Sequence, residues 1–316
     1  MTNAARIDVH QHVVPPFWAD ALPLNGGDPS GWNCPSWSPE SALRFMDSQQ
    51  IATGVLSLTA PSVVGWKPYE RRDMAKRVND YTADIVAKNP TRFGNFATLP
   101  LPDVDAALVE ITRAFDGLKA DGVVLLSNYE GAYLGDAKFE PIWAELNRRA
   151  AVVFIHPGHP ELTLIEGIPG PTVDYPFDTT RTAVQIVLNG VMDRYPNLKI
   201  ILSHAGGFVP YAAYRFAEIG TLLKHGSVTA NELLAKFQRF YFDTALSSSP
   251  VALPTLKAFA GTQNILYGSD FPYAPATTGA TFTQHLDAYE GFNADEHKAV
   301  NHSNALKLFP RLAALA

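Results

Sequence analysis

Short apolar runs alternate with longer amphipathic segments along almost the whole chain. The runs are rich in consecutive Val, Ile and Leu, which is typical of parallel strands buried on both faces. The amphipathic segments repeat their apolar positions with helical spacing. The pattern predicts strands over 6–12, 53–59, 93–100, 122–128, 152–156, 198–204, 240–244 and 264–270, and helices over 39–49, 70–89, 104–118, 139–150, 179–195, 209–224, 230–237 and 251–260.

Eight strands, each followed by a helix or a long crossover, predict an α/β fold. Right-handed crossovers repeated in this way close most simply into a (β/α)8 TIM barrel, here a single domain over residues 1–316. An open doubly wound sheet is the alternative. It is disfavoured because no Gly-x-Gly-x-x-Gly follows the first strand and no Gly-x-x-x-x-Gly-Lys occurs in the chain.

Residues 13–41 interrupt the alternation after the first predicted strand. They contain Phe17, Trp18, Trp32 and Trp37 among many Pro and Gly, and neither Lys nor Arg. This composition predicts a long, irregular, aromatic-rich insertion, and long loops in compact domains are often functional. Two interpretations stay open, because the aromatic side chains can form a small core under the loop or face a substrate as part of a lid.

The composition limits the classes of function. With 316 residues, of which 47% are hydrophobic, the chain can bury a large core. Lys and Arg total 25 and Asp and Glu 31, a net charge of −6 without a basic stripe, which argues against nucleic-acid and membrane partners. No signal-peptide pattern occupies residues 1–12. The only cysteine, Cys34, excludes an internal disulfide, and we expect a cytoplasmic location.

Metal-competent side chains gather at the predicted carboxyl ends of the strands, where TIM barrels carry their active sites. The first strand ends in His10 and His12, which alternation directs to the same side, about 7 Å apart at their Cα atoms. His156, His204 and Asp270 end later strands. Four of the nine histidines therefore lie at strand ends, which incidental structural histidines would not do.

Three imidazoles and a carboxylate suit Zn²⁺, with Mn²⁺ as one possible replacement. The sequence thus predicts a divalent metal site, and Asp243 at the end of the seventh strand is a candidate to hold an imidazole in place. A purely structural metal is disfavoured, because such zinc sites are usually rich in cysteine.

These residues, in this order, resemble the amidohydrolase superfamily. The motifs that carry the resemblance are His10-x-His12, His156-Pro157, Ser203-His204-Ala-Gly-Gly, Tyr241-x-Asp243-Thr244, Gly268-Ser-Asp270-Phe-Pro272 and Asn304-Ala. Within the superfamily, the chain is similar to the branch that contains aminocarboxymuconate-semialdehyde decarboxylase and the hydroxybenzoate decarboxylases, including 6-methylsalicylate decarboxylase. The resemblance covers essentially the whole chain.

The resemblance implies a mononuclear metal site with His10, His12, His156 and Asp270 as ligands. A single metal also fits the strand over 122–128, which has no lysine that could bridge a second ion. His204 would be the general acid/base. The resemblance further implies a homodimer or a dimer of dimers, in which Arg215 reaches across the interface to a carboxylate of the substrate.

We therefore predict a carboxy-lyase that removes CO₂ without oxidation from a small, hydroxy-aromatic carboxylic acid. The semialdehyde decarboxylase has a further arginine in the segment after the first strand, and residues 13–41 have none, which favours a monocarboxylate. Its ring could stack against Trp18, Trp32, Trp37 or Phe17, of which we expect Phe17 and Trp18 to bind the substrate. The alternative is a metal-dependent lactonase or amidohydrolase that attacks with metal-bound hydroxide, with Asp270 or His204 as the base.

Overall fold

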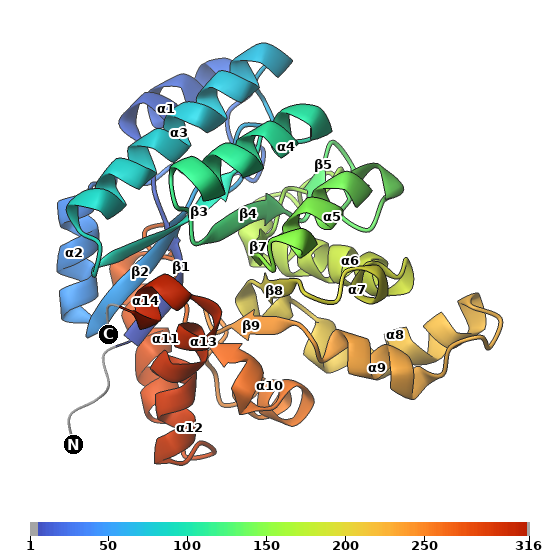
Figure 1. Cartoon of the computed structure of the whole chain (residues 1–316). Helices are drawn as coiled ribbons and strands as arrows, with labels where there is room; N and C mark the ends of the chain where they lie inside the picture. Colours follow the sequence, from blue (N-terminus) through green and yellow to red (C-terminus); the bar gives the residue numbers. More distant parts are fainter. Residues whose placement is uncertain (1–5, 315–316) are drawn as a thin grey trace.

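The structure is a computed structural model that describes residues 6–314. Within that range, eight parallel strands form one sheet in the order β1-β2-β3-β4-β7-β8-β9-β10, with helices outside it (Figure 1). The strands are β1 (Arg6–His12), β2 (Ile51–Ser57), β3 (Phe93–Thr98), β4 (Gly122–Leu126), β7 (Val152–His156), β8 (Lys199–Leu202), β9 (Tyr241–Asp243) and β10 (Ile265–Leu266). A short hairpin, β5 (Asn128–Tyr129) and β6 (Ala132–Tyr133), was not predicted from the sequence.

The two ends of this sheet meet along β1. The amide of Val9 donates to the carbonyl of Tyr267 at 3.0 Å, and the amide of His12 donates to the carbonyl of Phe271 at 2.8 Å. These bonds join the first strand to the segment around β10, so the sheet closes on itself. The predicted (β/α)8 barrel is confirmed.

The helices follow the strands as the amphipathic pattern predicts, with shifted ends. The predicted helix over 179–195 is divided at Gly190, whose φ of 74° ends one helix and begins the next. None of the helices in the described part of the chain is long and apolar enough to cross a membrane. The helices are α1 (Pro16–Ala21), α2 (Pro39–Ser48), α3 (Pro68–Lys88), α4 (Val104–Thr112), α5 (Glu140–Arg148), α6 (Asp174–Leu188), α7 (Val191–Arg194), α8 (Val209–Leu223), α9 (Ala230–Phe237), α10 (Ala252–Ala260), α11 (Ala276–Asp287), α12 (Ala294–Lys298), α13 (Asn304–Leu308) and α14 (Pro310–Ala313).

Apolar side chains fill the interior of the barrel at the amino ends of the strands. Phe96 stacks on Phe154 with ring centroids 5.4 Å apart, and Phe309 packs on Phe96 at 5.8 Å. Phe309 joins α13 to α14, and the guanidinium of Arg311 on α14 donates to the carbonyl of Phe93 at 3.0 Å. The helices α13 and α14 therefore close this end of the barrel, and the predicted metal-binding side chains lie at the opposite end.

Residues 13–41 are more ordered than the sequence pattern predicts. They contain α1, which begins directly after Pro15, and a 3₁₀ turn over Leu22–Asn25. The ring of Trp18 is completely buried, stacks on Trp66, and donates from its indole nitrogen to the carbonyl of Ser62 at 2.8 Å. This part of the segment is therefore packed against the rest of the protein.

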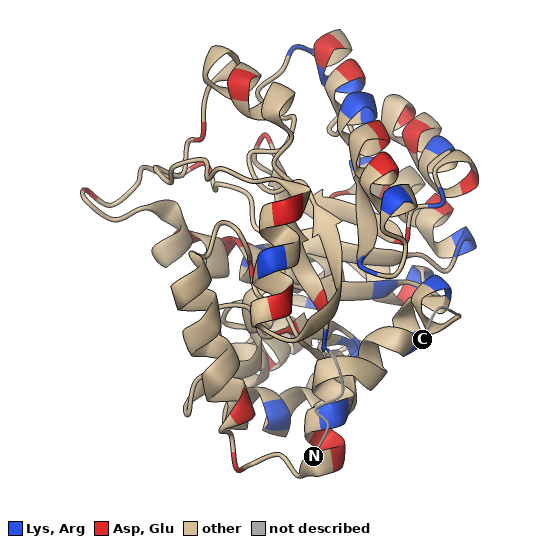
Figure 2. Cartoon of the chain, turned by 90° about the vertical axis from the view of Figure 1, so that its left-hand side faces the viewer, with Lys and Arg blue, Asp and Glu red and all other residues tan. Residues whose placement is uncertain are grey.

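The outer surface carries charges of both signs. Figure 2 shows Lys and Arg interspersed with Asp and Glu along the outer helices, while the strands of the barrel are largely uncharged. Pairs such as Lys88 with Asp84, whose atoms lie 2.6 Å apart on α3, illustrate this mixing. Unlike the other outer helices, the pair α8 and α9 extends outward from the barrel, at the right of Figure 1.

Candidate metal centre and substrate cavity

Five side chains from four strand ends converge at the carboxyl end of the barrel. The Nε2 atoms of His10 and His12 lie 3.1 Å apart, and Oδ1 of Asp270 lies 3.2 Å from the first and 2.9 Å from the second. Ligand atoms of His10, His156, His204 and Asp270 all lie within 4.8 Å of one another. The structure thus brings together the side chains predicted at this centre, and a ring nitrogen of His204 lies within 4.8 Å of the donor atoms of His10, His156 and Asp270.

Each of the four imidazoles is held through its Nδ1 atom. Every Nδ1–H donates to a fixed acceptor, which orients the ring and turns Nε2 toward the common centre, as is usual for metal-binding histidines. The acceptors are Asp243 Oδ2 for His10 (2.8 Å) and backbone carbonyls for the others: Ser57 for His12 (3.2 Å), Pro157 for His156 (2.9 Å) and Ala245 for His204 (3.1 Å). Four nitrogens and a carboxylate aimed at one point are a donor set that fits a divalent cation.

The electrostatics of this centre favour a positive charge. Burial alone would lower the pKa of His10, but the charges of Asp243 and Asp270 outweigh burial and raise that pKa to about 10. Burial lowers the pKa of His12 and, more strongly, that of His156. Burial would raise the pKa of Asp270, but the charge of His10 holds it well below its ordinary value. The two carboxylates therefore favour a positive charge beside His10.

Two carboxylates support the centre from outside. Asp8 is completely buried and accepts from the amides of His10 and Ser269, each at 3.0 Å. Asp243 holds the ring of His10 and also accepts from the amide of His204 at 3.0 Å. The supporting role predicted for Asp243 is confirmed, and this one carboxylate holds both His10 and His204.

The backbone is distorted where the strands end. In β1, the register shifts between Asp8 and Gln11, so one extra residue is accommodated at a bulge, a feature that re-aims side chains near active sites. His204 and Asp270 have φ values of 52° and 63°, in the left-handed region that L-residues rarely adopt. The fold therefore accepts local strain in order to turn these two side chains toward the centre.

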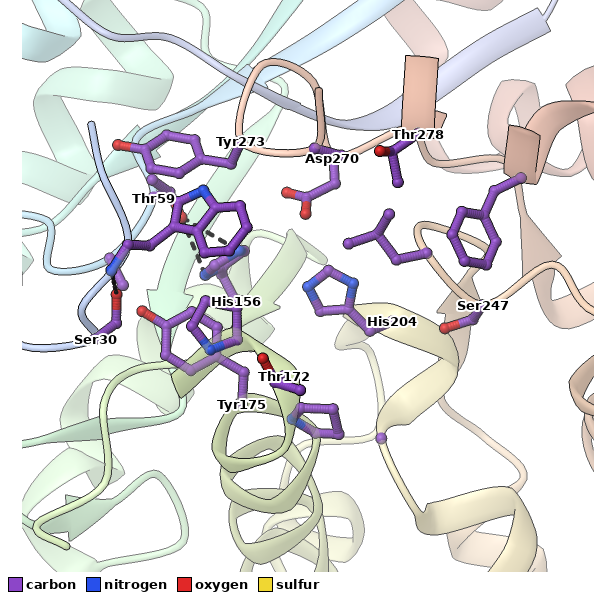
Figure 3. Close-up of a pocket in the computed structure, with 18 of the residues that line it drawn as sticks. Ser30, Thr59, His156, Thr172, Tyr175, His204, Ser247, Asp270, Tyr273 and Thr278 are labelled. Carbon is purple, nitrogen blue, oxygen red and sulfur yellow. Dashed lines mark hydrogen bonds between the residues drawn. The ribbon is translucent and has the colours of Figure 1, made fainter. Parts of the chain in front are cut away.

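A cavity of about 550 Å³ opens above the centre, a size typical of small-molecule sites. His156, His204 and Asp270 contribute to its lining, whereas His10 and His12 are completely buried behind them. None of the lining residues is Arg or Lys. Figure 3 shows Asp270 and His204 between two sides of the cavity, with Tyr273, Thr59, Ser30 and Tyr175 on one side and Thr278 and Ser247 on the other.

The predicted substrate-binding residues Phe17, Trp18 and Arg215 do not line this cavity in the single chain. Phe17 packs against Tyr81, with ring centroids 5.7 Å apart. Trp18 is in the core, as described above, because α1 turns both rings toward the barrel wall and α3. The contact expected between a substrate and these two rings is therefore corrected. Arg215 lies exposed on α8.

Other aromatic residues supply the cavity wall. Trp32, from the same segment as Phe17, lines the cavity, as do Tyr175 at the start of α6 and Tyr273 after Asp270. The ring of Tyr273 lies edge-to-face with His12 at 5.5 Å. Trp32 is one of the four aromatic residues of the insertion that the sequence offers for stacking against a substrate, whereas neither tyrosine is among the predicted site residues. The sequence offers one indication of this role, which is that Tyr273 follows the predicted ligand Asp270 by only three residues.

Comparison with known proteins agrees with this geometry. The amidohydrolase family matches residues 7–311. The chain belongs to this family. A 6-methylsalicylic acid decarboxylase of Penicillium expansum is 43% identical over 98% of this chain and 97% of its own, and the decarboxylase yanB of Aspergillus niger is 42% identical over 97% and 88%. Among solved structures, 5-carboxyvanillate decarboxylase LigW from Sphingomonas paucimobilis superposes with a TM-score of 0.86 at 26% identity, over 97% of this chain and 99% of that one. The resemblance inferred from the motifs is confirmed.

Proposed function

We propose that this amidohydrolase-family protein is a metal-dependent decarboxylase that removes CO₂, without oxidation, from a small hydroxy-aromatic carboxylic acid. The observation that carries the proposal is the position of His204, whose ring shares the metal-competent centre and also lines the substrate cavity. The proposal is supported by relatives at 42–43% identity that are named decarboxylases. The aromatic rings of Trp32, Tyr175 and Tyr273 suit a planar substrate.

We assign His10, His12, His156 and Asp270 as the metal ligands. His10 and His12 have no exposed surface and His156 only 3%, whereas His204 is only half-buried and can meet a substrate. When bound, a divalent cation supplies the positive charge that holds the substrate carboxylate or its neighbouring hydroxyl. Zn²⁺ suits these nitrogen and oxygen donors best, and Mn²⁺ is the second candidate.

His204 is assigned the role of proton donor. The carbonyl of Ala245 holds its Nδ1–H, so the proton on Nε2 of the imidazolium is the one free to transfer. In the step we propose, that proton bonds to the ring carbon that carries the carboxylate, the bond from this carbon to the carboxylate breaks, and its electron pair restores the aromatic ring as CO₂ leaves. Protonation before bond cleavage avoids a free aryl anion. His204 then regains a proton from solvent through the cavity mouth.

The carboxylate clamp is proposed to come from a second copy of the chain. The cavity lining contains no Arg or Lys, and Arg215 lies exposed on α8, the helix that projects from the barrel. Tyr211, Tyr214 and Leu222 on α8 are 86%, 71% and 71% exposed, an apolar surface of the kind that protein interfaces cover. A homodimer or a dimer of dimers would bury this surface and could bring Arg215 to the neighbouring cavity.

The decisive experiment is a screen of hydroxybenzoates for CO₂ release, followed by product identification in D₂O. We expect deuterium at the carbon that carried the carboxylate and at no other carbon of the product. Ring opening of a lactone or cleavage of an amide, with no CO₂ from any hydroxybenzoate, would replace the decarboxylase with the hydrolase alternative. Metal analysis of the same sample tests for one divalent ion per chain.

A further inference from the structure

Leu246 occupies an unusual position in the cavity wall. It lies in the loop after β9, is half-buried, and lines the cavity. Its φ is 51°, in the left-handed region, where a bulky side chain is an outlier. Among the described non-glycine residues with positive φ, it is the only one with a branched apolar side chain.

The requirements of the fold do not explain a leucine at this position. A left-handed backbone is relaxed for Gly and tolerated by Asn, whereas Leu is strained there. The loop is already held by other bonds, since the amide of Ala245 donates to Asp243 Oδ1 at 2.9 Å and the amide of Ser247 donates to the carbonyl of Thr244 at 3.1 Å. Strained residues of this kind cluster at functional sites, where the surrounding structure holds them.

The neighbours of Leu246 place it beside the proton donor. The carbonyl of the preceding residue, Ala245, accepts from Nδ1 of His204, so the two residues are fixed to the same loop. Phe282 on α11 also lines the cavity, one turn after Thr278, which Figure 3 shows on the side of Ser247. The side chains of Leu246 and Phe282 therefore add an apolar surface to the side opposite Tyr175 and Tyr273.

We propose that Leu246 is a specificity-determining residue that accepts an apolar substituent next to the carboxyl-bearing carbon of the substrate ring. The inference rests on the proposed function, because it assumes a hydroxy-aromatic acid held at the metal centre. With the carboxylate and one ortho hydroxyl at the metal, the second ortho position of the ring points away from it. An alkyl group there gains contact with Leu246, whereas a hydroxyl group there loses water without gaining a partner on that side chain.

The test compares two inert ligands on the metal-loaded protein. In 3-methyl-2-nitrophenol and 2-nitroresorcinol, a nitro group replaces the carboxylate, and the second ortho substituent is methyl in the first and hydroxyl in the second. We expect the wild-type protein to bind the methyl compound about tenfold more tightly, the discrimination that one buried methyl group allows. Leu246→Asn keeps a side chain that tolerates the left-handed backbone, and should abolish or reverse this preference.

Two further variants separate specificity from folding. Leu246→Gly should relieve backbone strain, leave the melting temperature no lower, and still lose the preference for methyl. Val251→Asn makes a similar change at a residue that is 79% exposed, outside the cavity lining, and should keep the preference. An unchanged ratio of dissociation constants in Leu246→Asn would overturn the proposal, as would loss of the preference in Ser247→Ala, which would assign it to that hydroxyl.

A parallel CO₂ assay on 2-hydroxy-6-methylbenzoate distinguishes the two levels of inference. Methyl selectivity that depends on Leu246, without CO₂ release from this compound or from any other hydroxybenzoate in the screen, would leave the specificity assignment standing and overturn the decarboxylase. CO₂ release from this compound, together with a preference for methyl that is the same in Leu246→Asn as in the wild-type protein, would support the decarboxylase and overturn the specificity assignment. If neither nitrophenol binds the metal-loaded wild-type protein, the specificity assignment is wrong.

Discussion

The cavity has a floor, which is the metal centre of His10, His12, His156, His204 and Asp270, and walls, which are its other lining residues. The two are built in different ways. At the floor, each imidazole is fixed by a hydrogen bond from Nδ1 to a backbone carbonyl or to Asp243, and its residue lies in the last three positions of a strand or within two residues after it. The walls come from loops and helix starts, which contribute Trp32, Leu246 and Tyr175. Reaction chemistry requires a geometry that does not vary, whereas substrate choice can change with the loops.

Removing the metal should have the largest effect, because the floor acts only when a cation is present. Dialysis against a chelator should abolish CO₂ release, and adding back one equivalent of Zn²⁺ or Mn²⁺ should restore it. The rate and the metal content per chain are measured on the same samples. Full activity in a metal-free sample would contradict the role given to the floor.

His204→Asn should lower kcat by about 10²–10⁴-fold, the usual contribution of a general acid. An amide can still donate to the carbonyl of Ala245, so the loop should keep its position, and metal content should stay near one ion per chain. His225→Asn is the matched control, because His225 is exposed at the end of α8 and its φ of 51° suits Asn. Loss of the metal in His204→Asn would instead make His204 a ligand.

Asp243→Asn should weaken metal affinity about 10–100-fold, as changes in the partners of metal-binding histidines usually do. An amide NH₂ facing Nδ1 of His10 would favour the proton on Nε2, where the metal must bind. Competition with a chelating dye measures the affinity, and Asp84→Asn on the exposed face of α3 should leave it unchanged. Equal affinities for both variants would show that Asp243 only fills space.

Arg215→Ala should raise KM about tenfold with a smaller change in kcat, because a charge-assisted contact to the carboxylate is lost. The stronger test uses mixed dimers. One subunit carries Arg215→Ala and the other His204→Asn, so that a clamp acting across the interface leaves one cavity of the two with both residues intact and a wild-type KM, whereas a clamp acting within one chain leaves none. Wild-type KM in a monomeric protein would contradict the dimeric arrangement.

The pH dependence of metal binding should be the finest test of the floor. The pKa of His10 in the metal-free chain is raised to about 10, so this ring is protonated at neutral pH and must lose its proton when a metal binds. Affinity should therefore increase about tenfold for each unit of pH between about pH 6 and about pH 8. Calorimetry in buffers of different ionisation enthalpy measures the proton released, and a flat profile would be incompatible with the raised pKa.

The floor could be predicted from the sequence because strand patterns determine where side chains lie. A strand that ends in His10 and His12 must present them at the mouth of a barrel, whatever the loops do. The walls depend on contacts between distant segments. The amide of Gly170 donates to the carbonyl of Ser30 at 2.8 Å, which links two loops that together cover the cavity, and no periodicity in the sequence indicates such a bond.

The error over Phe17 and Trp18 has the same origin. Aromatic residues in a loop can face a ligand or the core, and composition does not distinguish the two. The indole nitrogen of Trp18 donates a hydrogen bond to the carbonyl of Ser62, which holds the ring inside the protein. Trp32, in the same segment, lines the cavity. Which of these rings face the core therefore depends on contacts with distant segments, a hydrogen bond to Ser62 for Trp18 and packing on Tyr81 for Phe17.

The closure of the barrel has a consequence for biosynthesis. His12 and Asp270 are 258 residues apart, and the helices that seal the apolar interior, α13 and α14, follow the eighth strand. While the ribosome is still making β10, the nascent polypeptide has neither a complete binding place for the cation nor a covered interior. Capture of the ion must therefore be one of the final events of maturation.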